Sequence, residues 1–335
     1  MLRFTLRRLI LLVPVLFGLT ALVFAIARLL PGDPVALAAG PNATPAEIAA
    51  YGREFGLDRP LLVQYGDYLA GLFHGNFGVS IYTRRPVSED LAAYLPATLE
   101  LVFSAMLIAI LVGIPAGLAA AVWRGRWPDY VSRVVALGSI SMPRFFLGLL
   151  LQLLFAMWLG WLPLGGRFPI AEDPPAFVTG FLTLDALFAR DLSAFWTALQ
   201  HLAMPAIAMS LSPLATIMRM MRASTLEVMQ QDYVLTERAL GLPQRLIVMK
   251  YVARNAISAT LTVIGLYFGW LLGGTVLVET VFDWPGLGLY ATKAVVTQDF
   301  MPVIGVTLVI GTLFVLANFV IDLLYGVINP KVRYE

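Results

Sequence analysis

The chain has 335 residues, of which 59% are hydrophobic and only 13% are charged, and its mean hydropathy is +0.81. Because soluble domains carry roughly a quarter charged residues, this composition excludes an ordinary water-soluble protein. The net charge of +2 argues against a nucleic-acid surface, and the absence of cysteine excludes disulfides and thiolate chemistry.

Apolar segments recur from one end of the chain to the other. A membrane-spanning helix needs about 20 apolar residues, because the hydrocarbon core tolerates only internally hydrogen-bonded backbone. Six stretches contain no Asp, Glu, Lys or Arg: Leu9–Ala27, Leu101–Trp123, Phe145–Gly166, Leu192–Met218, Asn255–Val278 and Phe300–Ile321. We therefore expect an all-α membrane protein in which residues 1–335 form one transmembrane domain. Its six spans are predicted at residues 9–27, 101–123, 134–160, 198–218, 255–278 and 300–321.

The first apolar stretch follows Arg3, Arg7 and Arg8, and it ends in the small-x-small sequence Ala25-Ile26-Ala27. A cleaved signal peptide is therefore an alternative to a first span. The stretch is longer than the usual apolar region of a signal peptide, so we expect a retained helix.

Residues 31–97, between the first two spans, are too patterned to be a simple spacer. Thr44-Pro45-Ala46-Glu47 has the residues of a helix start, with Thr as N-cap and Glu at the capping-box position. We expect a folded extracytoplasmic cap; a structured loop without ligand contact is the alternative. A second external stretch, Gly165–Asp191, is either a lid or a connector.

Residues 219–254 are too polar to span a membrane, yet they contain helix-forming segments interrupted at Gly241-Leu242-Pro243. Glycine relieves backbone strain at a helix end, and proline disfavours continuation of the preceding helix. The pattern predicts a helix, a turn and a second helix, which would offer a surface to another protein. A solvated loop is the simpler alternative.

Residues 279–288 follow the fifth span. Phe282 and Trp284 have the amphipathic character of an aromatic belt at the membrane interface, and Pro285-Gly286 would reverse the chain. An aromatic belt is the simpler interpretation of this segment.

Basic residues favour one orientation. With a cytoplasmic amino terminus, the inside segments are residues 1–8, 124–133, 219–254 and the tail from Asp322, and these hold most of the Arg and Lys. Positive charge is enriched in cytoplasmic loops. We therefore expect both termini in the cytoplasm.

The chain carries few signs of chemistry of its own. No phosphate-binding sequence of the Gly-x-x-x-x-Gly-Lys-Ser/Thr type occurs, so we expect no ATP hydrolysis by this chain. His74 and His201 lack a neighbouring ligand pattern, and we expect no metal site. Polar residues near the span ends, such as Arg144 and Gln152, are expected to be structural rather than solute-binding. Gly113-x-x-x-Gly117 and Gly269-x-x-x-Gly273 match the close-packing pattern of membrane helices.

The polar segment and both ends of the chain resemble a known family. Residues 232–242, with the sequence Asp-Tyr-Val-Leu-Thr-Glu-Arg-Ala-Leu-Gly-Leu, resemble the coupling loop of binding-protein-dependent ATP-binding-cassette importers. Residues 279–288 and the tail motifs Asp322-Leu323-Leu324-Tyr325 and Asn329–Tyr334 resemble the dipeptide/oligopeptide permease subfamily. Motifs in the first half of the chain support the same resemblance: Arg7-Arg8, Pro31-Gly32-Asp33-Pro34, Leu57-Asp58-Arg59-Pro60, Leu95–Glu100 and Ser141-Met142-Pro143. One departure is that the family's Glu-Ala-Ala is Leu235-Thr236-Glu237 here.

The resemblance implies a six-span permease of the type I importer class. Its partners would be a second homologous permease, two cytoplasmic ATPases that use ATP and Mg²⁺, an extracytoplasmic solute-binding protein and membrane lipid, with no cofactor bound by this chain. The ATPase-coupling residues implied are Asp232, Tyr233, Leu235, Thr236, Glu237, Arg238, Ala239 and Gly241. An external hairpin near the gate would comprise Glu279, Phe282, Asp283, Trp284, Pro285 and Gly286.

The function expected from this resemblance is uptake of di- or oligopeptides across a bacterial-type inner membrane by alternating access. The same architecture would also serve glutathione, haem, a nickel chelate or an oligosaccharide, and no residue discriminates among these solutes. A membrane anchor subunit that does not transport is the alternative from a different class.

Overall fold

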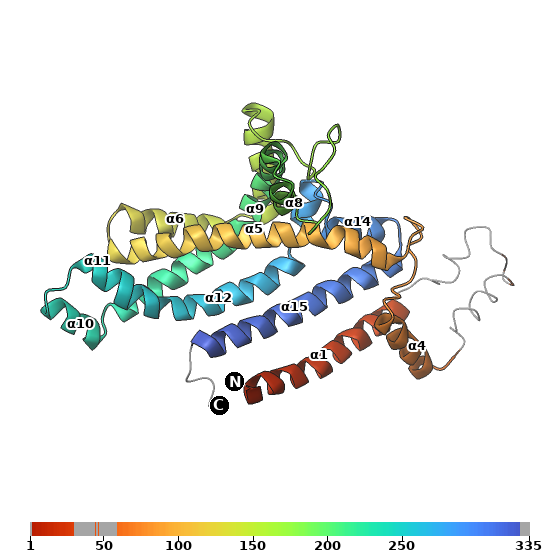
Figure 1. Cartoon of the computed structure of the whole chain (residues 1–335), viewed down its shortest axis with the longest axis horizontal. Coiled ribbons are helices and arrows are strands. Elements are labelled where there is room, and N and C mark those ends of the chain that lie inside the picture. Colours follow the sequence, from red (N-terminus) through yellow and green to blue (C-terminus); the bar gives the residue numbers. More distant parts are fainter. Residues whose placement is uncertain (1, 30–43, 45, 47–58, 329–335) are drawn as a thin grey trace.

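The computed structural model describes residues 2–29, 44, 46 and 59–328, and these residues are almost entirely helical (Figure 1). Its first half contains α1 (Leu2–Leu29), α4 (Leu61–Phe73), α5 (Val87–Val122), α6 (Trp127–Ser141), α7 (Arg144–Leu151) and the π-helical segment η1 (Gln152–Trp158). The Pro31–Pro34 motif, Leu57 and Asp58, and the tail motif from Asn329 lie outside the described residues.

The second half contains α8 (Leu182–Phe188), α9 (Leu192–Val228), α10 (Asp232–Ala239), α11 (Gln244–Leu246), the π-helical η2 (Ile247–Val252), α12 (Ala253–Gly273), α13 (Val276–Val281), α14 (Leu287–Val296) and α15 (Phe300–Ile328). Within the described ranges, five helical stretches are long and apolar enough to cross a bilayer: Thr5–Ile26, Val87–Val122, Leu192–Val228, Gln244–Gly273 and Phe300–Ile321. The expected all-α membrane fold is confirmed.

The third predicted span, residues 134–160, is not one straight helix. Trp127–Ser139 and Arg144–Trp158 meet at an angle of 106°. Met142, between them, has an extended backbone and precedes Pro143, which begins the second piece. A residue before proline is pushed out of the α region, so the chain bends there. Counting the bent pair as one span brings the number of spans to six.

The helix of the second span begins earlier than predicted. α5 starts at Val87, directly after Pro86, and continues without interruption to Val122. The last part of the segment assigned to the external cap, residues 87–97, is therefore the first part of this long helix.

Among the described helices, α5 and α9 form the most extensive pair. Gly113 and Gly117 bring the two backbones together, because a Cβ at Gly117 would lie 2.5 Å from the carbonyl oxygen of Met218. Buried Leu101, Met209 and Ile217 fill the shared core. In the second glycine pair, Gly269 and Gly273, only Gly269 makes a close helix contact. Because it has no side chain, the ring of Phe314 on α15 packs directly against it.

The two ends of the bundle carry different structures. α10 and α11 lie at one end, and α4 and α14 lie at the other (Figure 1). α1 lies beside α15, which lies beside α12. The beginning of α1 and the end of α15 point toward the α10 side (Figure 1). The predicted coupling segment and the predicted hairpin are therefore separated by the length of the bundle.

Candidate functional site

The coupling segment is a short helix held on the end of α9. α10 (Asp232–Ala239) begins after the extended Gln231, and its buried Val234 packs with Ile247 and Val252 of η2. One buried apolar residue thus fixes α10 against the start of the next span. The rest of the short helix faces outward.

The predicted coupling residues are brought together on this helix. Asp232, Tyr233, Leu235, Thr236, Arg238 and Ala239 are exposed, and Glu237 is partly exposed. Leu240, just beyond the helix, is 72% exposed, and Leu235 is 51% exposed. Leu235 and Leu240 thus place exposed apolar surface beside the charged residues of this segment. The Tyr233 hydroxyl accepts a hydrogen bond of 3.0 Å from Asn255 Nδ2, which ties α10 to α12.

Gly241 ends the coupling helix in a conformation that L-residues avoid. Its φ is +77°, and no atom lies within 4 Å of the position that a Cβ would take. The amide N–H of Gly241 donates to the carbonyl of Arg238. A side chain here would therefore strain the backbone rather than collide with a neighbour.

The predicted hairpin is a helical turn packed into the opposite end of the bundle. α13 ends at Val281, residues 282–286 turn, and α14 begins at Leu287. Phe282 and Trp284 are each only 1% exposed, so the interpretation of these two residues as an interfacial aromatic belt is wrong. They are core residues: Trp284 Nε1 donates to the carbonyl of Ala97 on α5 at 2.9 Å, and the Phe282 ring packs against Gly148 of α7. Asp283 points outward at the turn, with φ +46°.

The buried side chain of Glu279 connects this turn to α5 and α14. Its buried carboxylate accepts hydrogen bonds from Thr98 Oγ1 at 2.8 Å and from the N–H of Leu289 at 3.0 Å. A Cβ on Gly286 would lie 2.5 Å from the carboxylate carbon, so glycine is needed for this close approach. Burial raises the pKa of Glu279, although these hydrogen bonds act in the opposite direction.

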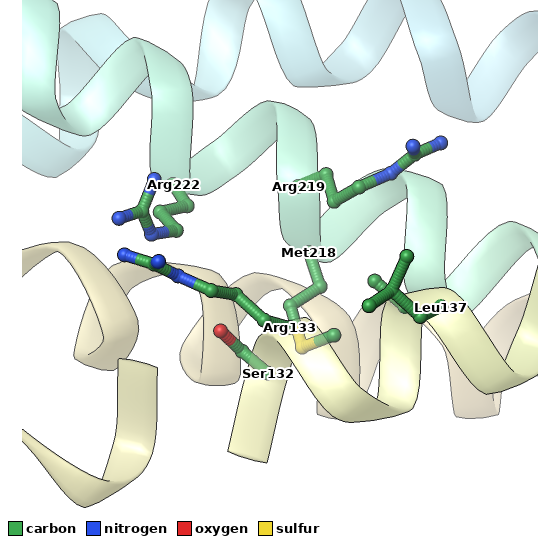
Figure 2. A pocket seen from close by; sticks show the side chains of 7 residues that line it. Ser132, Arg133, Leu137, Met218, Arg219 and Arg222 are labelled. Carbon is green, nitrogen blue, oxygen red and sulfur yellow. The ribbon is translucent and has the colours of Figure 1, made fainter. Parts of the chain in front are cut away.

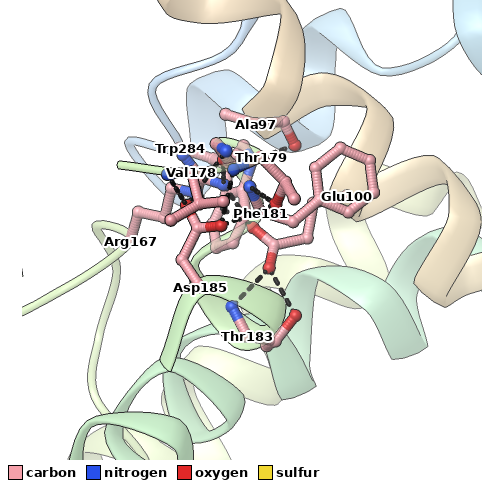
Figure 3. A network of polar contacts seen from close by, with 10 residues as sticks. Ala97, Glu100, Arg167, Val178, Thr179, Phe181, Thr183, Asp185 and Trp284 are labelled. Carbon is pink, nitrogen blue, oxygen red and sulfur yellow. Dashed lines mark hydrogen bonds and ion pairs between the residues drawn. The ribbon is translucent and has the colours of Figure 1, made fainter. Parts of the chain in front are cut away.

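A buried ion pair joins the second external stretch to α5. Arg167 Nε donates to Glu100 Oε2 at 3.0 Å, while Thr183 donates to Glu100 Oε1 from its N–H at 2.9 Å and from its hydroxyl at 2.6 Å (Figure 3). The side chains of Arg167 and Glu100 are 13% and 2% exposed. Arg167 also donates to the carbonyl of Gly180 and lies 5.7 Å from the centre of the Trp284 ring. The pair thus connects α5, the 165–191 stretch and the hairpin turn.

Asp185 of α8 organises the same stretch. Its carboxylate accepts from the N–H and hydroxyl of Thr179, each at 2.7 Å, and from the N–H of Gly180 at 2.9 Å (Figure 3). Burial opposes the charged form, but these hydrogen bonds outweigh it and hold the pKa of Asp185 below its usual value. Asp185 therefore orders the 165–191 stretch internally, while Glu100 of α5 attaches that stretch to the bundle.

Two other polar residues singled out in the sequence, Gln152 and His201, have structural partners. Gln152 Nε2 donates to the carbonyls of Leu164 and Val281 at 2.8 and 3.0 Å. His201 Nδ1 lies 3.0 Å from the carbonyl of Gly165. In the described part of the chain, no three His, Asp or Glu side chains are grouped as a metal site would require.

The Glu100–Arg167 pair was not predicted, although the sequence carries a signal for it. Glu100 immediately precedes the uncharged run Leu101–Trp123, and Arg167 immediately follows Phe145–Gly166. In the expected topology, the start of the second span and the end of the third span lie on the same side of the membrane. Opposite charges at neighbouring span ends are candidates for an ion pair.

Comparisons with known proteins cover the chain from end to end. Residues 113–334 match the family described as binding-protein-dependent transport system inner membrane component, and residues 1–102 match its N-terminal membrane component. The chain is 46% identical to the "Probable D,D-dipeptide transport system permease protein" of Escherichia coli (strain K12), over 96% of this chain and 94% of that protein. It is 44% identical to the di/tripeptide transport system permease protein of Pseudomonas aeruginosa (strain UCBPP-PA14) and 39% identical to the glutathione transport system permease protein of Salmonella typhi. Both of these alignments cover 100% of each chain.

These matches run through the spans, the coupling segment and the hairpin, and they include relatives that are themselves transport permeases. The family is one of membrane transport components rather than enzymes. The chain therefore belongs to the family of binding-protein-dependent transport system inner membrane components, the permease subunits of ATP-binding-cassette importers.

Proposed function

We propose that this chain forms half of the translocation pathway of an importer for di- or oligopeptides. The observation that carries the proposal is the similarity, from end to end of the chain, to permeases named for dipeptides and di/tripeptides. A second permease completes the pathway, two ATPase subunits use ATP and Mg²⁺, and an external binding protein delivers the solute. This chain binds no cofactor itself.

The coupling helix α10 is the proposed contact with an ATPase subunit. Its position at one end of the bundle, its exposed Leu235 and Leu240, and its attachment to both α9 and η2 support this role. A push on α10 would be passed to two membrane helices at once. The hairpin of residues 279–286 lies at the opposite end, near the proposed external gate.

The substrate is tested by uptake into liposomes. The complete importer is reconstituted with its binding protein, and accumulation of a radiolabelled dipeptide is measured with ATP enclosed. We expect ATP-dependent accumulation that unlabelled dipeptides suppress and glutathione does not. Because one relative is a glutathione permease, the reverse competition would assign this chain to glutathione instead and would refute the dipeptide proposal.

The orientation proposed for the chain places α10 in the cytoplasm and the 165–191 stretch outside. Since the chain has no cysteine, single cysteines report their own positions. In intact cells, a membrane-impermeant thiol reagent should label Glu172→Cys and should not label Gln244→Cys until the cells are opened. Both positions are exposed. Labelling of Gln244→Cys alone in intact cells would reverse the orientation.

A further inference from the structure

A cavity of about 420 Å³ lies between α6 and α9, apart from the coupling helix and the hairpin. It is lined by Ser132, Arg133, Ala136, Leu137, Met218, Arg219 and Arg222. Figure 2 shows Arg133 and Arg222 together on one side, with Leu137 and Arg219 on the other. Ala136, Leu137 and Met218 make part of the wall apolar. The cavity therefore combines guanidinium groups with a hydrocarbon-like surface.

The charge around this cavity is not balanced by the protein. Arg133 and Arg222 share one carboxylate, Asp129, through contacts of 2.8 Å each. In the described part of the chain, no acidic side chain pairs with Arg219, whose guanidinium donates a 3.5 Å hydrogen bond to the Thr216 hydroxyl. Two guanidinium groups thus share a single carboxylate, and a third, that of Arg219, lies on the other side of the cavity (Figure 2). An anion would complete the arrangement.

The cavity lies at the depth of lipid headgroups. Arg219 is the first charged residue after the uncharged run Leu192–Met218 of α9. Two aromatic residues of α6 near Arg133 are exposed. Tyr130, one turn before Arg133, is 58% exposed, and Trp127, about two turns before it, is 75% exposed. Exposed Trp and Tyr at the end of a span mark the membrane interface. A ligand here would have its polar part at the interface and its apolar part along the helices.

We infer that this cavity, the α6–α9 pocket, binds an anionic phospholipid. The phosphate lies against the guanidinium groups of Arg133 and Arg222, an acyl chain lies along Leu137 and Met218, and Arg219 on the other side of the cavity adds to the positive potential that attracts the headgroup. Basic pockets between membrane helices bind anionic lipid headgroups in this manner. Arg222 lies in the last two turns of α9 before the coupling helix, so the lipid braces α6 against the helix that carries α10.

The test uses the assembled importer and phosphatidylglycerol with a photoreactive acyl chain. After illumination, adducts are mapped by mass spectrometry. We expect adducts in residues 129–139 and 214–222, suppressed by unlabelled phosphatidylglycerol and by neither phosphatidylcholine nor inorganic phosphate. Arg219→Gln, which breaks no ion pair, should lower the adduct yield about fivefold.

The matched control is Arg254→Gln, which removes the same charge from an exposed position on α12. It should leave the yield unchanged, and size-exclusion chromatography checks assembly of each variant. Equal loss in Arg254→Gln, equal suppression by phosphatidylcholine, or adducts located elsewhere would overturn the proposal. So would displacement by inorganic phosphate, which would show a phosphate site without lipid, or cross-linking of the pocket to the second permease.

Discussion

Gly241→Val is expected to lower solute uptake and solute-stimulated ATP turnover at least tenfold. The φ of +77° at Gly241 lies in the left-handed region, where a β-branched residue costs roughly 1–3 kcal/mol. The chain would relieve this backbone strain most easily by forming a different turn after α10. That change would misplace the coupling helix relative to the ATPase. Glu237→Ala should reduce uptake less, because it removes a polar contact without moving the backbone.

Two controls separate coupling from folding. Asparagine tolerates left-handed φ better than other L-residues, so Gly241→Asn should retain most of the uptake. Membrane abundance and association with the ATPase are measured for each variant. A Gly241→Val importer with normal abundance, normal ATPase association and normal stimulated turnover would show that the joint lies elsewhere.

Breaking the buried Glu100–Arg167 pair is expected to destabilise the permease by about 3 kcal/mol. Arg167→Met leaves the Glu100 carboxylate, which is 2% exposed, without its counter-charge, although Thr183 still donates to it. The 165–191 stretch and the hairpin turn would loosen together, since both contact Arg167. Thermal unfolding of the purified importer, followed by tryptophan fluorescence, measures the change.

The exposed ion pair between Arg59 and Asp67 is the matched control for this variant. Their charged atoms lie 3.1 Å apart, but their side chains are 57% and 61% exposed. Water screens such a pair, so Arg59→Met should change the midpoint little. In the double variant Arg167→Met/Glu100→Leu, part of the lost stability should return, because no buried charge remains unpaired. Equal effects of Arg167→Met and Arg59→Met would contradict the structural role of the pair.

Sequence reasoning succeeded where a single physical requirement governs the chain. A bilayer demands long uncharged helices, and the runs ending at Trp123 and Met218 lie in helices that meet the demand. The break after α10 also followed from local chemistry, since Gly241 is the residue that adopts the left-handed turn. Hydropathy and turn chemistry act over short stretches, so one sequence is enough to read them.

One misplaced detail is local: the bend at Met142-Pro143 follows from the restriction on a residue before proline, which the predicted continuous span 134–160 did not take into account. The others depend on tertiary packing. Trp284 has the character of an interfacial residue, but it is buried in the core cluster and hydrogen-bonds to Ala97, 187 residues earlier in the chain. The sequence separation of Glu100 and Arg167 likewise hides a contact that only the packed bundle creates. The spacing of apolar residues along the chain does not indicate which residues far apart in the sequence will be in contact.

The most direct test of the account is uptake with and without partner subunits. Proteoliposomes are made with the complete importer, with the ATPase subunits omitted, and with this chain alone, and labelled dipeptide accumulation is measured in the presence of ATP and binding protein. We expect accumulation only by the complete importer, because this chain supplies half a pathway and no phosphate-binding sequence. ATP-dependent uptake by the single purified chain would contradict it.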